Sequence, residues 1–276
     1  KGAASTLYGT GAATGVINIR LKRATKKALV GNGYFSVGTN ATAIHQNQKA
    51  SDFNQGFSVS GRTTKTTYFT ALNSTEIKGI SQIALPNPSL HYEEDPFSRL
   101  NYLAKIGYKV TNKLTFDFFG NYDQIKNDYD GGFDNTGTSD TNLNKTSSKQ
   151  FRFGFSPKFK YEKGEFILNS SFNKLVRSYD ELDTYSNSVG FAQYESRSVN
   201  VDGFNKFEIN PSFFLVSGVQ YQFHDANSST PYGNIAKENT KFNMIDPYLT
   251  GVYTSKMGFN MNAGARWNSH SAYGNQ

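Results

Sequence analysis

The first residues that could do chemistry form an acidic, glycine-containing stretch, NDYDGGFDNTGTSD, at residues 127–140. Calcium is held in proteins by about six to eight oxygen ligands, which carboxylates in such a loop can supply. The spacing of the carboxylates does not follow the EF-hand pattern, so a calcium site is one hypothesis and a solvated acidic loop is the other. The candidate ligands are Asp128, Asp130, Asp134 and Asp140.

A second candidate is the glycine-rich stretch GTGAATG at residues 9–15. Dinucleotide binding needs G-x-G-x-x-G between a strand and a helix, because the phosphates lie against the helix N-terminus. Here the third glycine, Gly15, stands one position too late, and the segment GVINIRLKR has the β-branched alternation of a strand. The Lys-Ser/Thr pair of a P-loop is also missing, so we do not expect nucleotide binding.

The other reactive residue types are scattered along the chain. There is no cysteine, which removes thiol catalysis, zinc–thiolate sites and disulfides. Adjacent carboxylates such as Asp180–Glu181 stand in polar stretches, where solvation is the simpler interpretation. The four histidines show no metal-binding spacing; they are His45, His91, His224 and His270. We therefore expect no catalytic residue and no enzyme.

Charge and composition favour a β-protein. The formal net charge is +7, but the basic residues are scattered apart from a cluster between Arg20 and Lys27. That cluster lacks interleaved aromatic residues for base stacking, so we interpret it as a linker and expect no nucleic-acid partner. Aromatic residues make up 15% of the chain although its mean hydropathy is −0.58. This combination is typical of strands with one aromatic and one polar face.

Alternation with a period of two over ten or more residues predicts strands and excludes amphipathic helices. In RLNYLAKIGYKV (99–110), the apolar residues from Leu100 to Val110 share one face, and Asn101, Lys105 and Lys109 share the other. About eleven such segments are expected. They lie at 34–38, 56–62, 66–74, 99–110, 113–123, 151–161, 166–179, 194–208, 213–224, 245–254 and 257–267.

Short and long connections alternate between these strands. Tight turns are expected near 63–65, 110–113, 162–164, 210–212 and 254–256. Long polar loops are expected near 41–53, 76–97, 126–148, 180–191 and 226–240, and from 271 onward. In an up-and-down sheet, this alternation places all tight turns at one end and all long loops at the other.

Outer-membrane barrels have this asymmetry, with short periplasmic turns and long extracellular loops. There is no run of 18 apolar residues, so a transmembrane helix is not expected. The pattern predicts a barrel whose apolar face contacts lipid and whose polar face lines the lumen. The charged residues expected to point inward are Lys105, Lys109, Asp117, Arg152, Lys158, Lys160 and Arg266.

The opening stretch, KGAASTLYGTGAATGVINIRLKR (1–23), resembles the end of the plug domain of TonB-dependent outer-membrane receptors. Many members carry a second glycine where Thr14 stands here, a departure that leaves Gly15 in place. The resemblance is dense but covers only these residues. The residues that carry its motif are Leu7, Tyr8, Gly9, Gly11, Gly15 and Asn18.

The resemblance implies an all-β protein, with the end of the plug domain and a linker at residues 1–28. Residues 29–276 would form the N-terminal half of an up-and-down antiparallel transmembrane β-barrel. Receptors of this kind close about 22 strands, so about eleven strands would be a partial barrel and the chain a fragment of a longer one.

The implied function is TonB-dependent active import of a scarce nutrient, of the ferric siderophore or cobalamin class, across the outer membrane of a Gram-negative bacterium. Plug apices and extracellular loops would bind the nutrient. No cofactor is expected apart from the calcium hypothesis. The expected partners are outer-membrane lipid, the TonB complex and the small-molecule nutrient.

Two alternatives remain open. A passive porin or adhesin barrel would lack energy coupling and a plug, so the motif at residues 1–19 argues against it. A soluble carbohydrate-binding or hydrolytic β-protein would seal its apolar face against a second layer and would be recovered without detergent.

Overall fold

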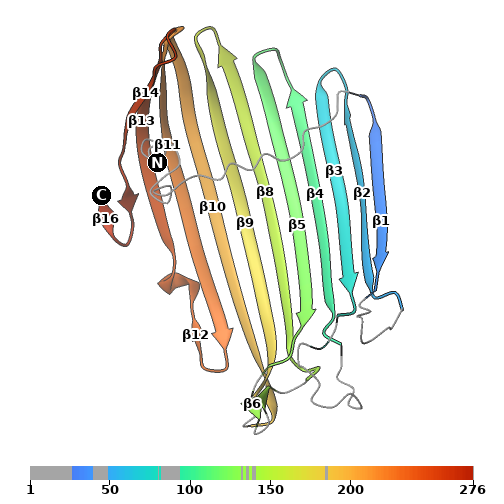
Figure 1. Cartoon of the computed structure of the whole chain (residues 1–276). Helices are drawn as coiled ribbons and strands as arrows, with labels where there is room; N and C mark the ends of the chain where they lie inside the picture. The colour runs from blue at the N-terminus through green and yellow to red at the C-terminus, as the bar shows by residue number, and fades with distance from the viewer. Residues whose placement is uncertain are drawn as a thin grey trace.

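The computed structural model describes residues 27–39, 49–79, 81, 94–131, 133–134, 137–138, 141–183 and 186–275. In this part of the chain, one antiparallel sheet contains all the long strands, each beside the next along the chain (Figure 1). The whole predicted plug motif, from Leu7 to Asn18, lies outside the described residues. Among the described residues, no helix has the length and apolar character needed to cross a membrane.

The long strands confirm the eleven predicted segments, mostly with wider bounds. They are β1 (Val30–Gly38), β2 (Asp52–Arg62), β3 (Thr66–Ile77), β4 (Phe97–Lys109), β5 (Leu114–Asp128), β8 (Lys145–Tyr161), β9 (Gly164–Asp183), β10 (Ser188–Asn210), β11 (Phe213–Thr230), β13 (Phe242–Thr254) and β14 (Asn260–Arg266). The short elements are β6 (Phe133–Asp134), β7 (Gly137–Thr138), β12 (Gly233–Ile235), β15 (Ser269–His270), β16 (Gly274–Asn275) and the 3-10 helix η2 (Lys237–Asn239).

The two ends of the sheet differ as predicted, with two corrections. The tight turns lie together at the upper end in Figure 1, and the longer connections between β1 and β2, β3 and β4, and β5 and β8 lie at the lower end. The long loop predicted at 180–191 is wrong, because β9 and β10 continue to Asp183 and Ser188. Asn187 adopts a φ of 51° in this connection, a left-handed conformation that asparagine tolerates in tight turns. The loop predicted at 226–240 is wrong in its first part, because β11 continues to Thr230 and pairs with β12.

The sheet is a single layer without a hydrophobic core. Val216 and Tyr248 are the only buried hydrophobic residues in the described part of the chain. Large apolar side chains stand in the open instead, with Ile106 51% exposed and Phe153 49% exposed. Contacts between the described elements join neighbours in the sheet, apart from the short helix η2 beside β11 and the separate β6–β7 pair. Neither a second layer nor a helix covers the apolar face there.

The register places the apolar side chains on one face across the whole sheet. Ile106 pairs with Phe118, and Phe118 pairs with Phe155, so these side chains share a face. The ring centroids of Phe118 and Phe155 are 4.6 Å apart and stacked. Residues one position away along each strand point to the opposite face.

The apolar face carries no charged residue over a continuous zone of the described strands. On β8 this zone runs from Phe151 to Tyr161, where the outward side chains are aromatic apart from Pro157. At about 3.4 Å per residue and a strand tilt of about 40°, such a segment spans about 28 Å along the membrane normal. This height is close to the apolar band of an outer-membrane barrel, which is about 25 Å.

On the opposite, polar face, an aromatic ring lies across a glycine. Phe119 on β5 pairs with Gly154 on β8. A Cβ atom at Gly154 would lie 2.2 Å from Cε1 of Phe119 and 2.7 Å from the carbonyl oxygen of Ser170. The ring therefore occupies space that only glycine leaves open. At Gly120, the next residue along β5, a Cβ atom would meet nothing within 4 Å.

We expect Gly154→Val to destabilise the sheet by about 1–3 kcal/mol, because the added side chain forces Phe119 and the backbone of β9 to shift. Gly120→Val is the matched control and should leave stability nearly unchanged. The measurement is the urea midpoint of unfolding in detergent, followed by the change in gel mobility between folded and unfolded protein. Equal losses in the two variants would show that the ring over Gly154 is not the cause.

Candidate functional site

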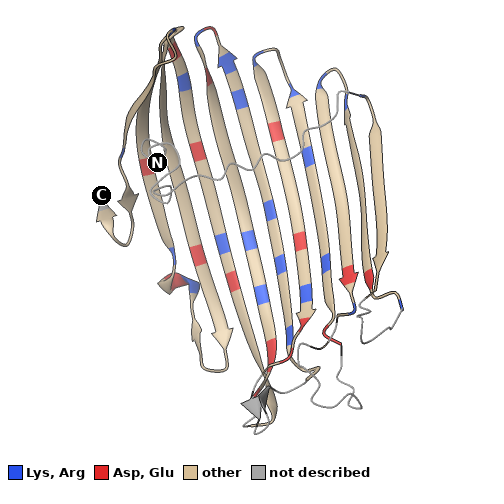
Figure 2. Cartoon of the chain, viewed as in Figure 1, with Lys and Arg blue, Asp and Glu red and all other residues tan. Residues whose placement is uncertain are grey.

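The polar face carries the side chains that could bind a ligand. Because cross-strand partners share a face, the register from β4 to β14 places all seven predicted charged residues opposite the aromatic face. Lys105, for example, pairs with Phe119, which lies across Gly154. Figure 2 shows that charged residues are spread along β4 to β11 and are sparse on β1 to β3.

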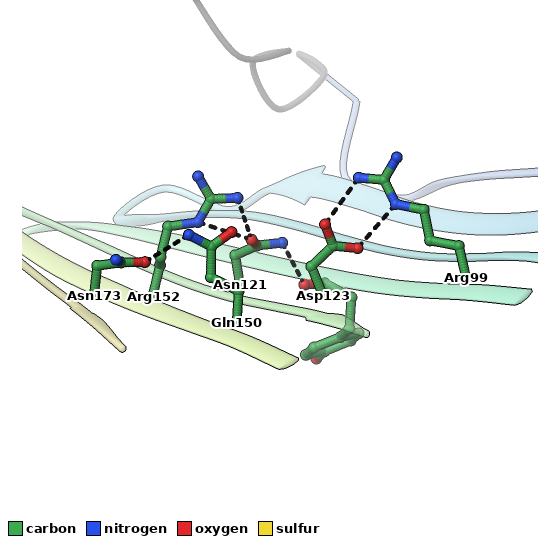
Figure 3. Close-up of polar contacts among 7 residues, drawn as sticks. Arg99, Asn121, Asp123, Gln150, Arg152 and Asn173 are labelled. Carbon is green, nitrogen blue, oxygen red and sulfur yellow. Dashed lines mark hydrogen bonds and ion pairs between the residues drawn. The ribbon is translucent and has the colours of Figure 1, made fainter. Parts of the chain in front are cut away.

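An arginine–carboxylate pair joins β4 and β5 on this face. Nε and Nη2 of Arg99 donate to the two carboxylate oxygens of Asp123, both at 2.9 Å (Figure 3). Such bidentate pairs are among the stronger charge-assisted hydrogen bonds. The Asp123 side chain is 12% exposed and that of Arg99 is 48% exposed. The guanidinium group therefore remains accessible.

A second arginine on the same face is held by an amide and not by a carboxylate. Arg152 on β8 donates to Oδ1 of Asn121 from Nε at 3.2 Å and from Nη2 at 2.8 Å. Asn121 in turn donates to the carbonyl oxygen of Tyr102 at 2.9 Å. Within the described residues, no carboxylate lies within ion-pair distance of Arg152. Its positive charge is fixed in place by an amide, and the Asp123 carboxylate interacts with it only at longer range.

These groups form a polar ladder beside a hollow. Nε2 of Gln150 donates to Oδ1 of Asn173 at 2.8 Å, which extends the line of amides to β9. The labelled side chains in Figure 3 stand on one side of the sheet. Asn121, Arg152, Asn173 and Phe119 line a hollow of about 450 Å³. This arrangement offers a fixed cation, amide donors and an aromatic surface to an anionic ligand.

A second hollow, of about 530 Å³, lies on the polar face between β9, β10 and β11, toward the long-loop end. The rings of Tyr179 and Tyr194 meet edge to face in its wall, with centroids 5.9 Å apart. Arg177 donates to the Tyr179 hydroxyl at 3.4 Å. The hollow can therefore accept a planar apolar group with an anionic substituent. Sequence reasoning missed both hollows, because their residues belong to strands far apart in the chain.

A buried polar cluster lies on the same polar face, near the C-terminal edge of the sheet. Arg266 on β14 donates to Asp246 on β13 at 2.7 Å, and the two side chains are only 5% and 3% exposed. The Tyr248 hydroxyl donates to Oδ1 of Asp202 at 2.9 Å. Because these groups bind one another and little of them is accessible, we assign this cluster to holding β10, β11, β13 and β14 together.

The predicted calcium loop is only partly described. Asp128 forms an ion pair with Lys145 at 3.1 Å. Asp130 accepts hydrogen bonds from the Ser81 hydroxyl at 3.0 Å and the Thr141 N–H at 3.1 Å. The side chains of Asp134 and Asp140 lie outside the described residues. Within those residues, no three His, Asp or Glu side chains gather closely enough to hold a metal ion. Calcium binding stays a prediction.

One asparagine attaches this loop to the sheet. Asn144 is 0% exposed, and its Oδ1 accepts a hydrogen bond from the backbone N–H of Leu182 on β9 at 2.7 Å. The backbone carbonyl oxygen of Asn144 accepts a hydrogen bond from the backbone N–H of Tyr129 at 3.2 Å. Burial, followed by the charge of Glu181, raises the pKa of the Tyr129 hydroxyl above its ordinary value.

Among known proteins, the similarities found are to solved structures. No protein-family model matches the chain, and no curated protein matches significantly. The ferric enterobactin receptor PfeA of Pseudomonas aeruginosa matches with a TM-score of 0.73 and 16% identity, over 98% of this chain and 43% of that one. The siderophore receptor PirA of Acinetobacter baumannii matches with a TM-score of 0.71 and 15% identity, over 98% and 43% of the two chains.

The outer membrane transporter YddB of Escherichia coli matches with a TM-score of 0.59 and 9% identity, over 93% of this chain and 41% of that one. The chain has the fold of part of an outer-membrane receptor barrel. It spans less than half the length of these receptors. The fold class predicted from sequence, an up-and-down antiparallel barrel in partial form, is confirmed.

We expect Asn144→Ala to loosen the loop end, because it leaves the partly buried Leu182 N–H without its acceptor, at a cost of about 1–3 kcal/mol. Hydrogen exchange at Leu182 should accelerate by a corresponding factor. Asn142→Ala removes an exposed asparagine two positions earlier and serves as the control. Unchanged exchange at Leu182 in Asn144→Ala would contradict the role of this side chain.

Proposed function

We propose that this chain forms part of the wall of a TonB-dependent receptor that imports a nutrient across the outer membrane of a Gram-negative bacterium. The observation that carries the proposal is the uncharged outward zone of the single-layer sheet. It has the height of a bilayer core, and the opposite face is polar. A soluble sandwich or enzyme would cover such a zone with a second layer. The match of 98% of the chain to two siderophore receptors supports the same assignment.

The nutrient class that the polar face favours is an anionic ferric chelate. Arg152 offers a cation that forms no direct ion pair with the described carboxylates, and Arg99 is accessible although it is paired. Tyr179 and Tyr194 add an aromatic surface near the long loops. A ferric siderophore of this class would present negative charge to the arginines and polar or aromatic arms to the tyrosine rings. Enterobactin is bound in a matched structure of the Pseudomonas receptor. We place cobalamin second, because the receptors that match over nearly the whole of this chain are siderophore receptors.

Energy coupling rests on the plug motif at residues 1–19, which belongs to the resemblance and not to the described structure. A plug in the lumen would face the inward charges of the sheet and would move when the TonB complex pulls on it. A passive porin or adhesin barrel would need neither the plug nor the energy. The motif is the reason that we prefer active import.

Deleting the gene should abolish growth on at least one ferric siderophore supplied as the sole iron source. An uncoupler that removes the proton gradient should stop uptake of the same radiolabelled chelate within minutes, because import against a gradient needs energy. Cells that carry a plasmid copy are the control. Uptake that continues in the presence of the uncoupler would favour the passive barrel.

Arg152→Gln should weaken binding of an anionic ferric chelate by about tenfold, because one charge-assisted contact contributes on the order of 1.5–3 kcal/mol. Lys160→Gln removes the same charge from the same face near the tight turns, away from the hollow, and should change the affinity little. Quenching of intrinsic fluorescence by the chelate gives both dissociation constants. Equal losses would mean that overall charge, and not the ladder, binds the ligand.

A further inference from the structure

Three hollows follow one another down the polar face, over the strands from β2 to β9. The first is the hollow beside Arg152, of about 450 Å³. The second has a volume of about 560 Å³ and shares Phe119 with the first. The third, of about 370 Å³, shares four lining residues with the second, among them Arg62 and Gly107. Together they form one groove, which we call the wall groove. It runs from the height of Arg152 to the tight turn between β2 and β3.

The wall groove is lined by five cations and one carboxylate. They are Arg62, Lys65, Lys105, Lys109, Arg152 and Asp117. In the described part of the chain, Arg62, Lys105 and Lys109 form no ion pair. The charged groups beside the groove are paired with one another, Arg99 with Asp123 at 2.9 Å and Lys158 with Glu165 at 2.7 Å. The groove therefore keeps an excess of positive charge.

The cations of the groove are spaced along its length. Arg152 pairs with Asn121, which pairs with Leu103, so Arg152 lies two residues above Lys105, or about 7 Å along the strands. Lys109 lies four residues further toward the tight turns, or about 14 Å. Its N–H donates to the carbonyl oxygen of Lys65 at 2.7 Å, which places Lys65 beside it in the turn. A ligand that leaves one cation therefore meets another below it.

A glycine keeps the groove open midway between Lys105 and Lys109. A Cβ atom at Gly107 would lie 2.5 Å from Oγ1 of Thr67 and 2.7 Å from Oδ1 of Asp117. The pairing of Arg62 with Thr67, Thr67 with Gly107 and Gly107 with Asp117 puts these four residues at one height. Arg62 and Asp117 thus stand on opposite sides of the groove, about 14 Å apart at the backbone. Only a glycine leaves the floor between them free.

We propose that the wall groove is the path along which an anionic ligand moves from the Arg152 hollow to the periplasmic end of the barrel. The inference rests on the proposed function and names the part of the lumen wall that carries the nutrient. Movement through a membrane protein needs several weak sites in place of one strong site, so that the ligand can leave each of them. Successive single cations with little competing negative charge meet this need. A cleft lined by one sign of charge also raises the local concentration of an oppositely charged ligand.

The test separates transport from binding in the full-length receptor, expressed in the gene-deletion strain. Lys105→Gln with Lys109→Gln removes two cations from the groove. Lys160→Gln with Lys206→Gln removes two exposed cations from the same face, also toward the tight turns but outside the three hollows, and is the matched control. The probe is the radiolabelled ferric siderophore on which the gene supports growth. Its dissociation constant is measured by fluorescence quenching, and its uptake rate is measured in cells at a saturating concentration.

We expect the groove variant to keep its dissociation constant within about twofold, because Arg152 is unchanged, and to lose about fivefold or more in uptake rate. The control variant should match wild type in both measurements. Lys105→Arg with Lys109→Arg keeps both charges and should restore most of the uptake. An unchanged uptake rate in the groove variant would overturn the proposal, and so would equal losses in the two Gln variants.

Other outcomes separate this inference from the proposed function. Wild-type protein that takes up no ferric siderophore would refute the proposed function, and the path with it. Normal uptake by both wild type and the groove variant would refute the path alone. A groove that only holds the plug would instead let the groove variant take up the siderophore in the presence of an uncoupler, and this result would also overturn the proposal.

Folding of each variant is checked by the change in gel mobility on heating. Lys105 and Lys109 form no ion pair with the residues that the structure describes, so we expect the groove variant to shift as wild type does. The Arg variant keeps the test decisive if the Gln variant folds poorly. Uptake by the Arg variant that is as slow as that of the Gln variant would show that charge in the groove is not the cause.

Discussion

Interstrand backbone hydrogen bonding is the constraint on which the rest of this structure depends. In hydrocarbon, a backbone N–H or C=O group without a partner costs several kcal/mol, so a membrane strand must pair along its full length. Neighbouring strands here pair without a break over long stretches, as β9 and β10 do from Gly164 to Asp183. The pairing also fixes the side chains: a slip of one residue would turn Phe153 inward and Arg152 toward lipid. The register therefore maintains the separation between the two faces.

The same constraint explains which parts of the fold could be predicted from sequence. A strand with lipid on one side and water on the other must alternate apolar and polar residues. The period of two at 99–110 and 151–161 therefore predicted both the strand and the face that each residue occupies. Alternation is lost where both faces meet water. The segment 180–191 is mostly polar and lacks a clear alternation, and this composition predicted a loop, although β9 and β10 continue there as paired strands. Polar composition marks the end of the membrane zone and not the end of the strand.

The candidate site was predictable as a set of residues but not as an arrangement. The inward charges follow from alternation in each strand taken alone, and Arg152 and Lys105 were placed correctly. Their partners depend on the register between strands, which single-strand patterns do not contain. Arg152 reaches Asn121, 31 positions away in sequence, and Tyr179 meets Tyr194 across a hairpin. The hollows arise from such pairs and could not have been found before the pairing was known.

Charge is distributed differently on the two faces, and this difference explains how one sheet can serve both lipid and ligand. On the inward face, charged residues occur at many heights, from Lys160 near the tight turns to Arg99 near the long loops, because a wet lumen solvates them everywhere. On the outward face they are absent through the apolar zone and reappear at its boundary toward the long loops. A solvated surface would have no reason to confine its charges in this way. Hydrocarbon excludes them over its own thickness and admits them again only at the head groups.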